Sequence, residues 1–244
     1  MHEPGVGGVK SAHRIDACMV DLDGTLVDTL GDFEAALAMM LRQLGRPPLA
    51  RVEIARLIGK GSEHLIREVL ARTGDGTRAV DAALFEAAWQ HYQAAYARVN
   101  GAHSRVYPGV REGLVALRAR GLPLACLTNK PLAHACALLA AKGLDGFFGL
   151  VFGGDSFARK KPDPLPLTQT CRALGTAPSC TLMIGDSAND AAAARAAGCP
   201  VVLMRYGYNH GEPVGAVDAD GCWDSLAELA IQWPFAPATP GGVP

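Results

Sequence analysis

The second half of the sequence alternates short apolar runs with stretches of helical periodicity, and this alternation limits the folds available to the chain. The apolar runs are 122–127, 150–152, 180–184 and 200–204, and the helical stretches are 110–120, 131–142, 164–174 and 188–197. Strands that alternate with helices predict a parallel sheet covered on both faces, with right-handed crossovers. The apolar run Ile15–Asp21 adds one more buried strand. We therefore expect a doubly wound α/β core.

The segment 29–104 has a different character, because its apolar residues recur at helical spacing and no convincing strand is visible. Breaks rich in Gly and Pro at 45–48 and 73–76 interrupt this spacing, and we expect four helices in the segment. We expect an all-helical insert at 29–104 in a core formed by 15–28 and 105–232. A flexible tail at 1–14 and a Pro-rich tail at 233–244 would flank that core. A length of 244 residues suits one core with a smaller insert.

The composition excludes several classes of protein. Lys and Arg number 23 and Asp and Glu 24, which argues against a dedicated nucleic-acid binder. No apolar run reaches the roughly 18 residues of a membrane span. The seven cysteines are scattered without C-x-x-C spacing, and no apolar targeting segment is visible near residue 1. We expect free thiols and a cytoplasmic protein, monomeric or homodimeric, with no membrane partner.

Two pairs of acidic residues follow predicted strands. Asp21 and Asp23 end the first strand, and Asp186 and Asp190 follow the run 180–184. A surface turn or a helix N-cap is the alternative for each pair, since Asp favours both. However, the carboxyl ends of parallel strands form the ligand-binding edge of such sheets. Carboxylates gathered there repel one another and suit a hard cation, so the pattern indicates a Mg²⁺ site.

Three other residues near strand ends suit an anion. Thr128 and Asn129 follow the run 122–127 and supply a hydroxyl and an amide. Lys161 lies in a cluster of three cations, which favours a solvated surface, but the prolines that follow fix the backbone and aim one lysine inward. Phosphoryl transfer needs a nucleophile, groups that neutralise the charge of the phosphoryl oxygens, and an acid for the leaving group. A carboxylate can be the nucleophile.

The motif Asp21–Thr29 (DLDGTLVDT) resembles the signature of the haloacid dehalogenase superfamily of phosphatases. The similarity continues in order through Leu127–Asn129, Lys161–Pro164 and Gly185–Asp190, and it spans most of the chain from Ile15 to about Trp223. Shorter strings resemble the phosphoglycolate phosphatase branch: Tyr107–Gly109, Gly59–Gly61 and Tyr206–Pro213. The resemblance implies hydrolysis of a small phosphate ester, with 2-phosphoglycolate as the best candidate.

The resemblance also implies a role for each motif residue. Asp21 would attack phosphorus and become a phosphoaspartate, while Asp23 would protonate the leaving group and then activate water. Mg²⁺ would be held by Asp21, the Asp23 carbonyl and Asp186, with Asp190 beside them. Thr128, Lys161 and their neighbours would bind or neutralise the phosphoryl group; the other expected substrate-binding residues are Asn129, Gly24 and Thr25. Cleavage of a carbon–halogen bond needs no acid, because no alkoxide leaves. The presence of Asp23 as a second acid therefore favours phosphate esters as substrates.

The helical insert resembles the cap of this superfamily and would hinge near 27–29 and 104–106. The loop Gly59–Ser62 would reach the substrate from the cap, and Lys60 would meet a substrate carboxylate. The alternative for Lys60 is a solvated residue in a loop between helices.

Two rival functions remain open. A sugar-phosphate phosphatase or a β-phosphoglucomutase-like mutase would keep the same site. A phosphoacceptor switch domain also pairs acids with Thr and Lys, but in a chain about half this length and without a cap.

Overall fold

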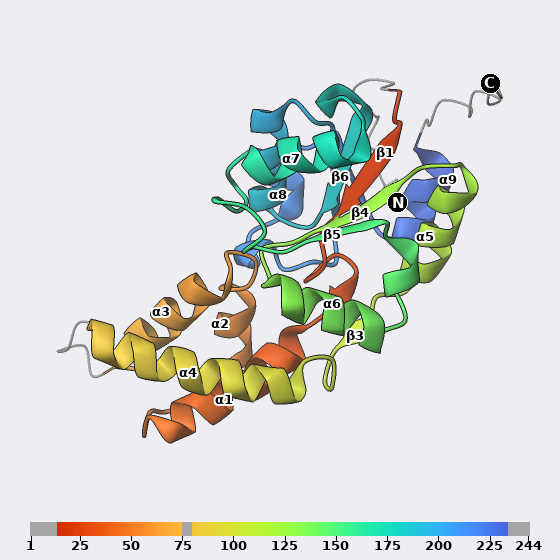
Figure 1. The fold of residues 1–244 in the computed structure, drawn as a ribbon. Coiled ribbons are helices and arrows are strands. Elements are labelled where there is room, and N and C mark those ends of the chain that lie inside the picture. Colours follow the sequence, from red (N-terminus) through yellow and green to blue (C-terminus); the bar gives the residue numbers. More distant parts are fainter. Residues whose placement is uncertain (1–13, 75–79, 234–244) are drawn as a thin grey trace, which may run out of the picture.

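The computed structural model describes residues 14–74 and 80–233. Its main feature is a six-stranded parallel sheet in the order β5-β4-β1-β6-β7-β8 (Figure 1). The strands are β1 (Ala17–Val20), β4 (Leu124–Leu127), β5 (Leu150–Phe152), β6 (Thr181–Gly185), β7 (Val201–Met204) and β8 (Gly221–Trp223). The expected doubly wound α/β core is confirmed.

Helices cover both faces of this sheet. One face carries α5 (Val110–Ala119), α6 (Leu132–Ala141) and α9 (Leu226–Gln232), and the other carries α7 (Leu165–Leu174) and α8 (Ala188–Ala197). Alternate residues of each strand supply the two cores: Cys18 and Val20 pack with the first group, and Met19 packs with the second. Every residue of β1 is buried, which explains its uninterrupted apolar sequence.

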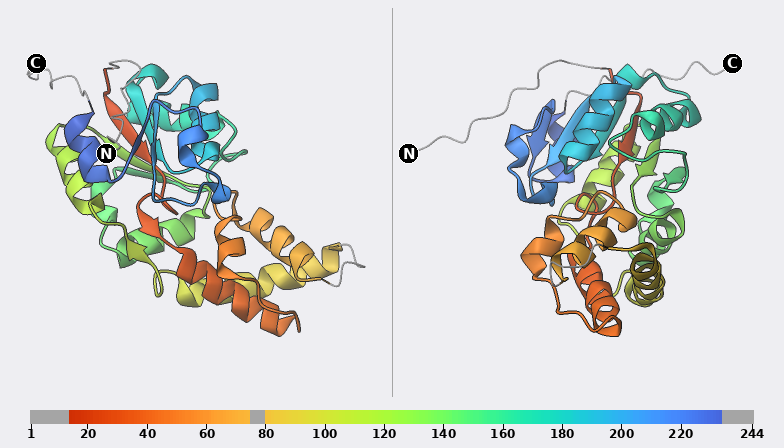
Figure 2. Two further views of the ribbon diagram at one scale, coloured as in Figure 1. Left: turned by 180° about the vertical axis from the view of Figure 1, so that it is seen from behind. Right: turned by 90° about the vertical axis from the view of Figure 1, so that its left-hand side faces the viewer.

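The helices of the insert lie at one end of the sheet (Figures 1 and 2). They are α1 (Leu30–Gln43), α2 (Arg51–Ala55), α3 (Ser62–Arg72) and α4 (Ala82–Val99). Their apolar stripes form a hydrophobic cluster of their own around Leu37, Ile66 and Tyr92. Two short antiparallel strands, β2 (Val27–Asp28) and β3 (Arg105–Val106), connect the insert to the core.

The topology places the predicted motifs at one edge. β1 pairs with β4 on one side and with β6 on the other. The residues after these three strands, Asp21, Thr128 and Asp186, therefore meet at the carboxyl edge. At this point the strand order reverses, because β4 and β5 lie on one side of β1 and β6 to β8 on the other. The insert lies over this edge (Figure 2).

The structure adds two elements at the C-terminal side that the sequence pattern does not indicate. β8 extends the sheet and α9 packs closely on α5, where Gly113 leaves no room for a side chain against Leu226. β8 has three residues, too few for a recognisable period. The expected tails fall almost entirely outside the described residues. Within the described ranges, no helix has both the length and the apolar character that crossing a membrane requires.

Candidate functional site: a carboxylate and lysine cluster

Asp21 and Asp23 lie at the carboxyl end of β1 and are both buried. The loop after Asp23 turns sharply at Gly24, whose φ of +86° favours glycine. A Cβ atom at Gly24 would lie 2.4 Å from Oδ2 of Asp186, so the absence of a side chain also allows close approach. The turn thus brings the two acids of β1 beside the acid that follows β6.

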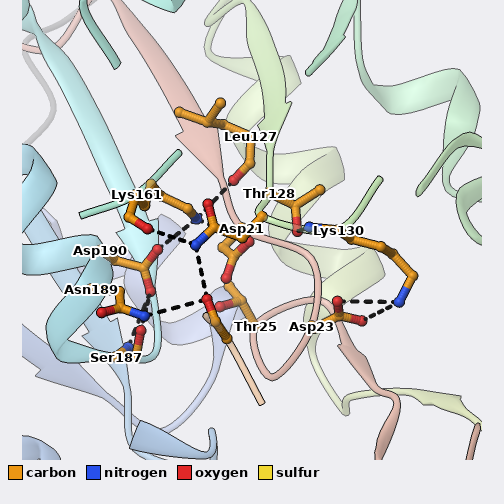
Figure 3. Close-up of polar contacts among 12 residues, drawn as sticks. Asp21, Asp23, Thr25, Leu127, Thr128, Lys130, Lys161, Ser187, Asn189 and Asp190 are labelled. Carbon is orange, nitrogen blue, oxygen red and sulfur yellow. Dashed lines mark hydrogen bonds and ion pairs between the residues drawn. The ribbon is translucent and has the colours of Figure 1, made fainter. Parts of the chain in front are cut away.

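Lys161 joins two of the predicted acids (Figure 3). Its Nζ atom lies 3.0 Å from Oδ1 of Asp21 and 2.6 Å from Oδ1 of Asp190. It also donates a 2.9 Å hydrogen bond to the carbonyl of Leu127 at the end of β4. The contacts to Asp190 and Leu127 are hydrogen bonds and the contact to Asp21 is an ion pair, so three acceptors surround the ammonium group. The predicted inward orientation of Lys161 is confirmed, since its side chain is 2% exposed.

Burial and charge shift the pKa values of these groups. Burial raises the pKa of Asp21 to about 7, with a further increase from Asp190 and Asp23 that Lys161 opposes. Burial likewise raises the pKa of Asp186, with contributions from Asp190 and Asp21. Burial disfavours the charged form of Lys161, but Asp190 and Asp21 outweigh it and raise its pKa. The lysine stays charged, while the acids resist ionisation without another cation.

Both carboxylate oxygens of Asp190 are bonded to other residues of the protein. Its Oδ2 atom accepts hydrogen bonds from the backbone N–H groups of Asp186 and Ser187, at 3.2 and 3.1 Å, and from the Ser187 hydroxyl at 2.8 Å. These bonds form a capping box at the start of α8. Oδ1 is engaged by Lys161. The helix-cap alternative for Asp190 is thus realised together with its contact to the lysine.

The acids fit a divalent cation. One oxygen each of Asp21, Asp186 and Asp190 lie within 4.8 Å of one another, and all three residues are buried. Because Asp190 is satisfied by Lys161 and by α8, Asp21 and Asp186 are the better ligands. Each oxygen of Asp186 receives one hydrogen bond, from Thr25 Oγ1 at 3.0 Å and from the Tyr208 backbone at 2.8 Å, which leaves lone pairs for an ion. Carboxylate oxygens are the hard donors that Mg²⁺ prefers.

Thr128 and Asn129 both line a cavity between the edge of the sheet and the insert. The Asn129 amide donates to the carbonyl of Lys161 at 2.8 Å and to the carbonyl of Gly59 at 2.9 Å, so it links the core to the insert. Its Oδ1 atom is buried without a hydrogen-bond partner. Thr25 is also buried, and its hydroxyl contacts Asp186.

The cavity lies between the sheet edge and the insert. It encloses about 20 Å³ in this closed arrangement, with Asp21, Asp23 and Thr128 on one side. The opposite wall is mostly apolar or aromatic: Phe33, Leu57, Ile58, Leu65, Tyr92 and Tyr96. Gly59, Gly61 and Ser62 reach it from the insert as expected, whereas the Lys60 side chain is exposed and does not line it.

Three residues of this region were not predicted. Lys130 is buried beside Asp23, and Tyr96 of α4 contacts the same ammonium. Tyr208 holds Asp186 through its backbone, and its hydroxyl lies at the start of α1. Lys130 directly follows the Thr128–Asn129 motif, which was a usable signal. No local pattern marks Tyr96, because only the folded chain brings it to the site. Tyr208 lies in the string Tyr206–Pro213, but that string does not indicate which of its residues contacts Asp186.

The comparisons with known proteins agree with this architecture. The family model of haloacid dehalogenase-like hydrolases matches residues 15–198. A phosphoglycolate phosphatase of Thiobacillus denitrificans is 46% identical over 217 residues, covering 89% of this chain and 95% of that protein. A protein of the same name from Nitrosospira multiformis is 46% identical over 214 residues, covering 88% and 93%.

A solved structure is also similar. The crystal structure of a predicted phosphoglycolate phosphatase from Haemophilus somnus superposes with a TM-score of 0.84 at 33% identity, covering 88% of this chain and 96% of that one. Fold, motif order and relatives lead to one assignment: the chain belongs to the haloacid dehalogenase-like hydrolases.

Proposed function

We propose that the protein is a Mg²⁺-dependent phosphatase that hydrolyses a small phosphate monoester, 2-phosphoglycolate, through an aspartyl-phosphate. The observation that carries this proposal is the convergence of Asp21, Asp23 and Thr128 on one cavity, with Lys161 on Asp21 and Asp186 beside it. Among the described residues, Asp21, Asp186 and Asp190 form the one group of acids that could hold a metal ion. The names of the relatives support the choice of substrate.

The first chemical step would use Asp21 and Asp23. An Asp21 oxygen attacks phosphorus, the bond between phosphorus and the ester oxygen breaks, and Asp23 gives a proton to the departing alkoxide. Lys161 holds the Asp21 carboxylate through their 3.0 Å contact and offsets charge near the phosphoryl group. The Thr128 hydroxyl would bind a phosphoryl oxygen, and the position of Thr128 in the lining of the cavity supports this role.

The second step would return the enzyme to its starting state. Water attacks the phosphoaspartate, Asp23 takes the proton of that water, and inorganic phosphate leaves while the Asp21 carboxylate is restored. When bound by Asp21, the Asp23 carbonyl and Asp186, Mg²⁺ would neutralise charge on the phosphoryl oxygens. Thr25 and Tyr208 position Asp186 for this task through hydrogen bonds to its carboxylate, and Gly24 leaves free the space that the carboxylate occupies.

We further propose that residues 29–104 act as a cap that opens for substrate entry. The enclosed volume of about 20 Å³ is close to the space of one water molecule, so the helices must move away from the sheet edge to admit an ester. The β2–β3 pair is the place for this motion, because both chain crossings between core and insert lie there. An apolar wall with few hydroxyl-binding groups favours a small substrate over a sugar phosphate.

A phosphate-release assay tests the proposed function. The purified protein with Mg²⁺ is offered 2-phosphoglycolate, several hexose phosphates and a nucleoside monophosphate. The proposal predicts selective turnover of 2-phosphoglycolate that chelation of the metal abolishes. Preference for hexose phosphates would contradict the substrate assignment, isomerisation of a hexose phosphate without phosphate release would indicate a mutase, and phosphoprotein without turnover would indicate a switch.

A further inference from the structure

Lys130 is a buried cation that the steps above do not use. Its side chain is 2% exposed, and its Nζ atom lies 2.9 and 3.2 Å from the two carboxylate oxygens of Asp23. The same atom donates to the hydroxyl of Tyr96 on α4. It also lies 4.8 Å from the ring centroid of Phe33 and 4.7 Å from that of Tyr96. The cation is therefore shared between the core, through Asp23, and two aromatic residues of the insert.

No other cation among the described residues that line the cavity can receive a second anionic group. Lys161 lies outside the lining, and its ammonium is already surrounded by the carboxylates of Asp21 and Asp190 and by the Leu127 carbonyl. His134 lines the cavity, but its Nε2 atom is 3.2 Å from Oε1 of Gln93, and burial and the nearby charge of Lys130 lower its pKa. Lys60 is exposed and lies outside the lining.

The surroundings of Lys130 favour a substrate carboxylate over an uncharged group, because Lys130 supplies the positive charge in an otherwise apolar region. The rings of Phe33 and Tyr96 lie against the ammonium, and Leu57 and Ile58 also line the cavity; these side chains do not compensate the charge of an anion. A carboxylate placed there needs a cation and a hydrogen-bond donor, while an alkyl group needs neither. The Tyr96 hydroxyl accepts from Lys130, so its own hydrogen can be donated to such a carboxylate.

We infer that Lys130 is the anchor for the substrate carboxylate, with the Tyr96 hydroxyl as second donor, and that this binding releases Asp23. The inference rests on the proposed function and deepens it. In the closed protein the ammonium holds the Asp23 carboxylate. A carboxylated phosphate ester places its own carboxylate on the same ammonium, the two anions exchange, and Asp23 turns toward the leaving oxygen. Esters without a carboxylate leave Asp23 bound to Lys130.

The test compares two esters that differ only in this group. kcat/KM is measured for 2-phosphoglycolate and for ethyl phosphate, in which a methyl group replaces the carboxylate. The wild-type protein is expected to prefer 2-phosphoglycolate by about 10- to 100-fold, the scale of one charged hydrogen bond. Lys130→Met is expected to bring this ratio close to one, and Lys130→Arg to retain part of it. Lys60→Met is expected to keep the wild-type ratio, since that side chain does not line the cavity.

Inhibition by inorganic phosphate reports separately on the phosphoryl site, and Lys130→Met should keep the wild-type inhibition constant within about threefold. Equal losses of kcat/KM for both esters in Lys130→Met would overturn the inference, as would loss of the preference in Lys60→Met alone. Equal turnover of the two esters by the wild-type protein overturns it without any variant, while the proposed phosphatase activity stands. If the wild-type protein hydrolyses neither ester, the proposed function itself fails.

Discussion

Nζ of Lys161 lies 2.6 Å from Oδ1 of Asp190, and both side chains are almost fully buried. The pair connects the loop after β5 with the first turn of α8, and through its second contact it fixes the orientation of Asp21. Removing one partner of a buried ion pair lowers the free energy of unfolding far more than removing one partner of an exposed pair.

Asp190→Asn is therefore expected to destabilise the fold by roughly 3–5 kcal/mol and to lower kcat, because Lys161 loses its closest carboxylate. Asp163→Asn is the matched control, since Asp163 forms an exposed ion pair with Arg159 worth at most about 1 kcal/mol. Urea unfolding and steady-state kinetics check both variants. Equal stability of the two variants would contradict the structural role given to the pair.

The metal-free protein should become less stable as pH rises through neutrality. Burial raises the pKa of Asp21 from 3.8 to about 7. The folded state therefore holds a proton that the unfolded chain has already lost, so stability is full below the unfolded pKa and declines through about pH 7. Mg²⁺ binds the ionised carboxylates, so the rise in melting temperature on adding Mg²⁺ should be larger at pH 8 than at pH 5.5. A metal effect that does not change with pH would contradict this account.

Gly207→Ala should weaken metal binding although it replaces no ligand. A Cβ atom at this position would lie 2.1 Å from Cβ of Asp186, so the carboxylate must move. A loss of about 10- to 100-fold in apparent Mg²⁺ affinity is expected, on the scale of other disturbed ligand supports. Gly215→Ala is the control because open space surrounds that position. Metal titration of activity measures both, and unchanged affinity in Gly207→Ala would contradict the placement of Asp186.

Tyr208→Phe should loosen the connection between core and insert. The hydroxyl donates to Asp28 at 2.7 Å and accepts from the backbone N–H groups of Thr29 and Leu30, at 2.8 and 3.0 Å. Its loss should cost about 1–3 kcal/mol and increase hydrogen exchange in the first turn of α1. In Tyr206→Phe, the control, only a bond to the Thr25 carbonyl is lost, so exchange in α1 should not change. Equal exchange in both variants would show that Tyr208 does not restrain the insert.

Much of the fold could be predicted because it follows from local periodicity. The buried residues of β1 and β6 read as apolar runs, and the helical stretches 164–174 and 188–197 agree closely with α7 and α8. α7 ends at Gly175 and α8 at Gly198, both with the positive φ that suits glycine at a helix end. β8 and α9 are stabilised by neighbours far away in sequence, so no local period marks them.

The candidate site could be predicted only where motif residues follow strands. Asp21, Asp186 and Lys161 meet as expected, because parallel strands deliver their ends to one edge. Lys60 was expected to face the substrate, but its side chain is exposed, and Lys130 is the lysine that lines the cavity. The direction of a side chain in a loop depends on its tertiary contacts, here Asp23 and Tyr96, and sequence spacing does not reveal these.

The central claim is that Asp21 is the residue that accepts the phosphoryl group. The most direct measurement is the mass of the Asp21 peptide after acid quenching of Asp23→Asn during reaction with 2-phosphoglycolate and Mg²⁺, since this variant should hydrolyse the intermediate slowly. The account predicts one added phosphoryl group on Asp21, and neither that label nor turnover in Asp21→Asn. Near wild-type phosphate release by Asp21→Asn, or a label confined to another residue, would contradict it.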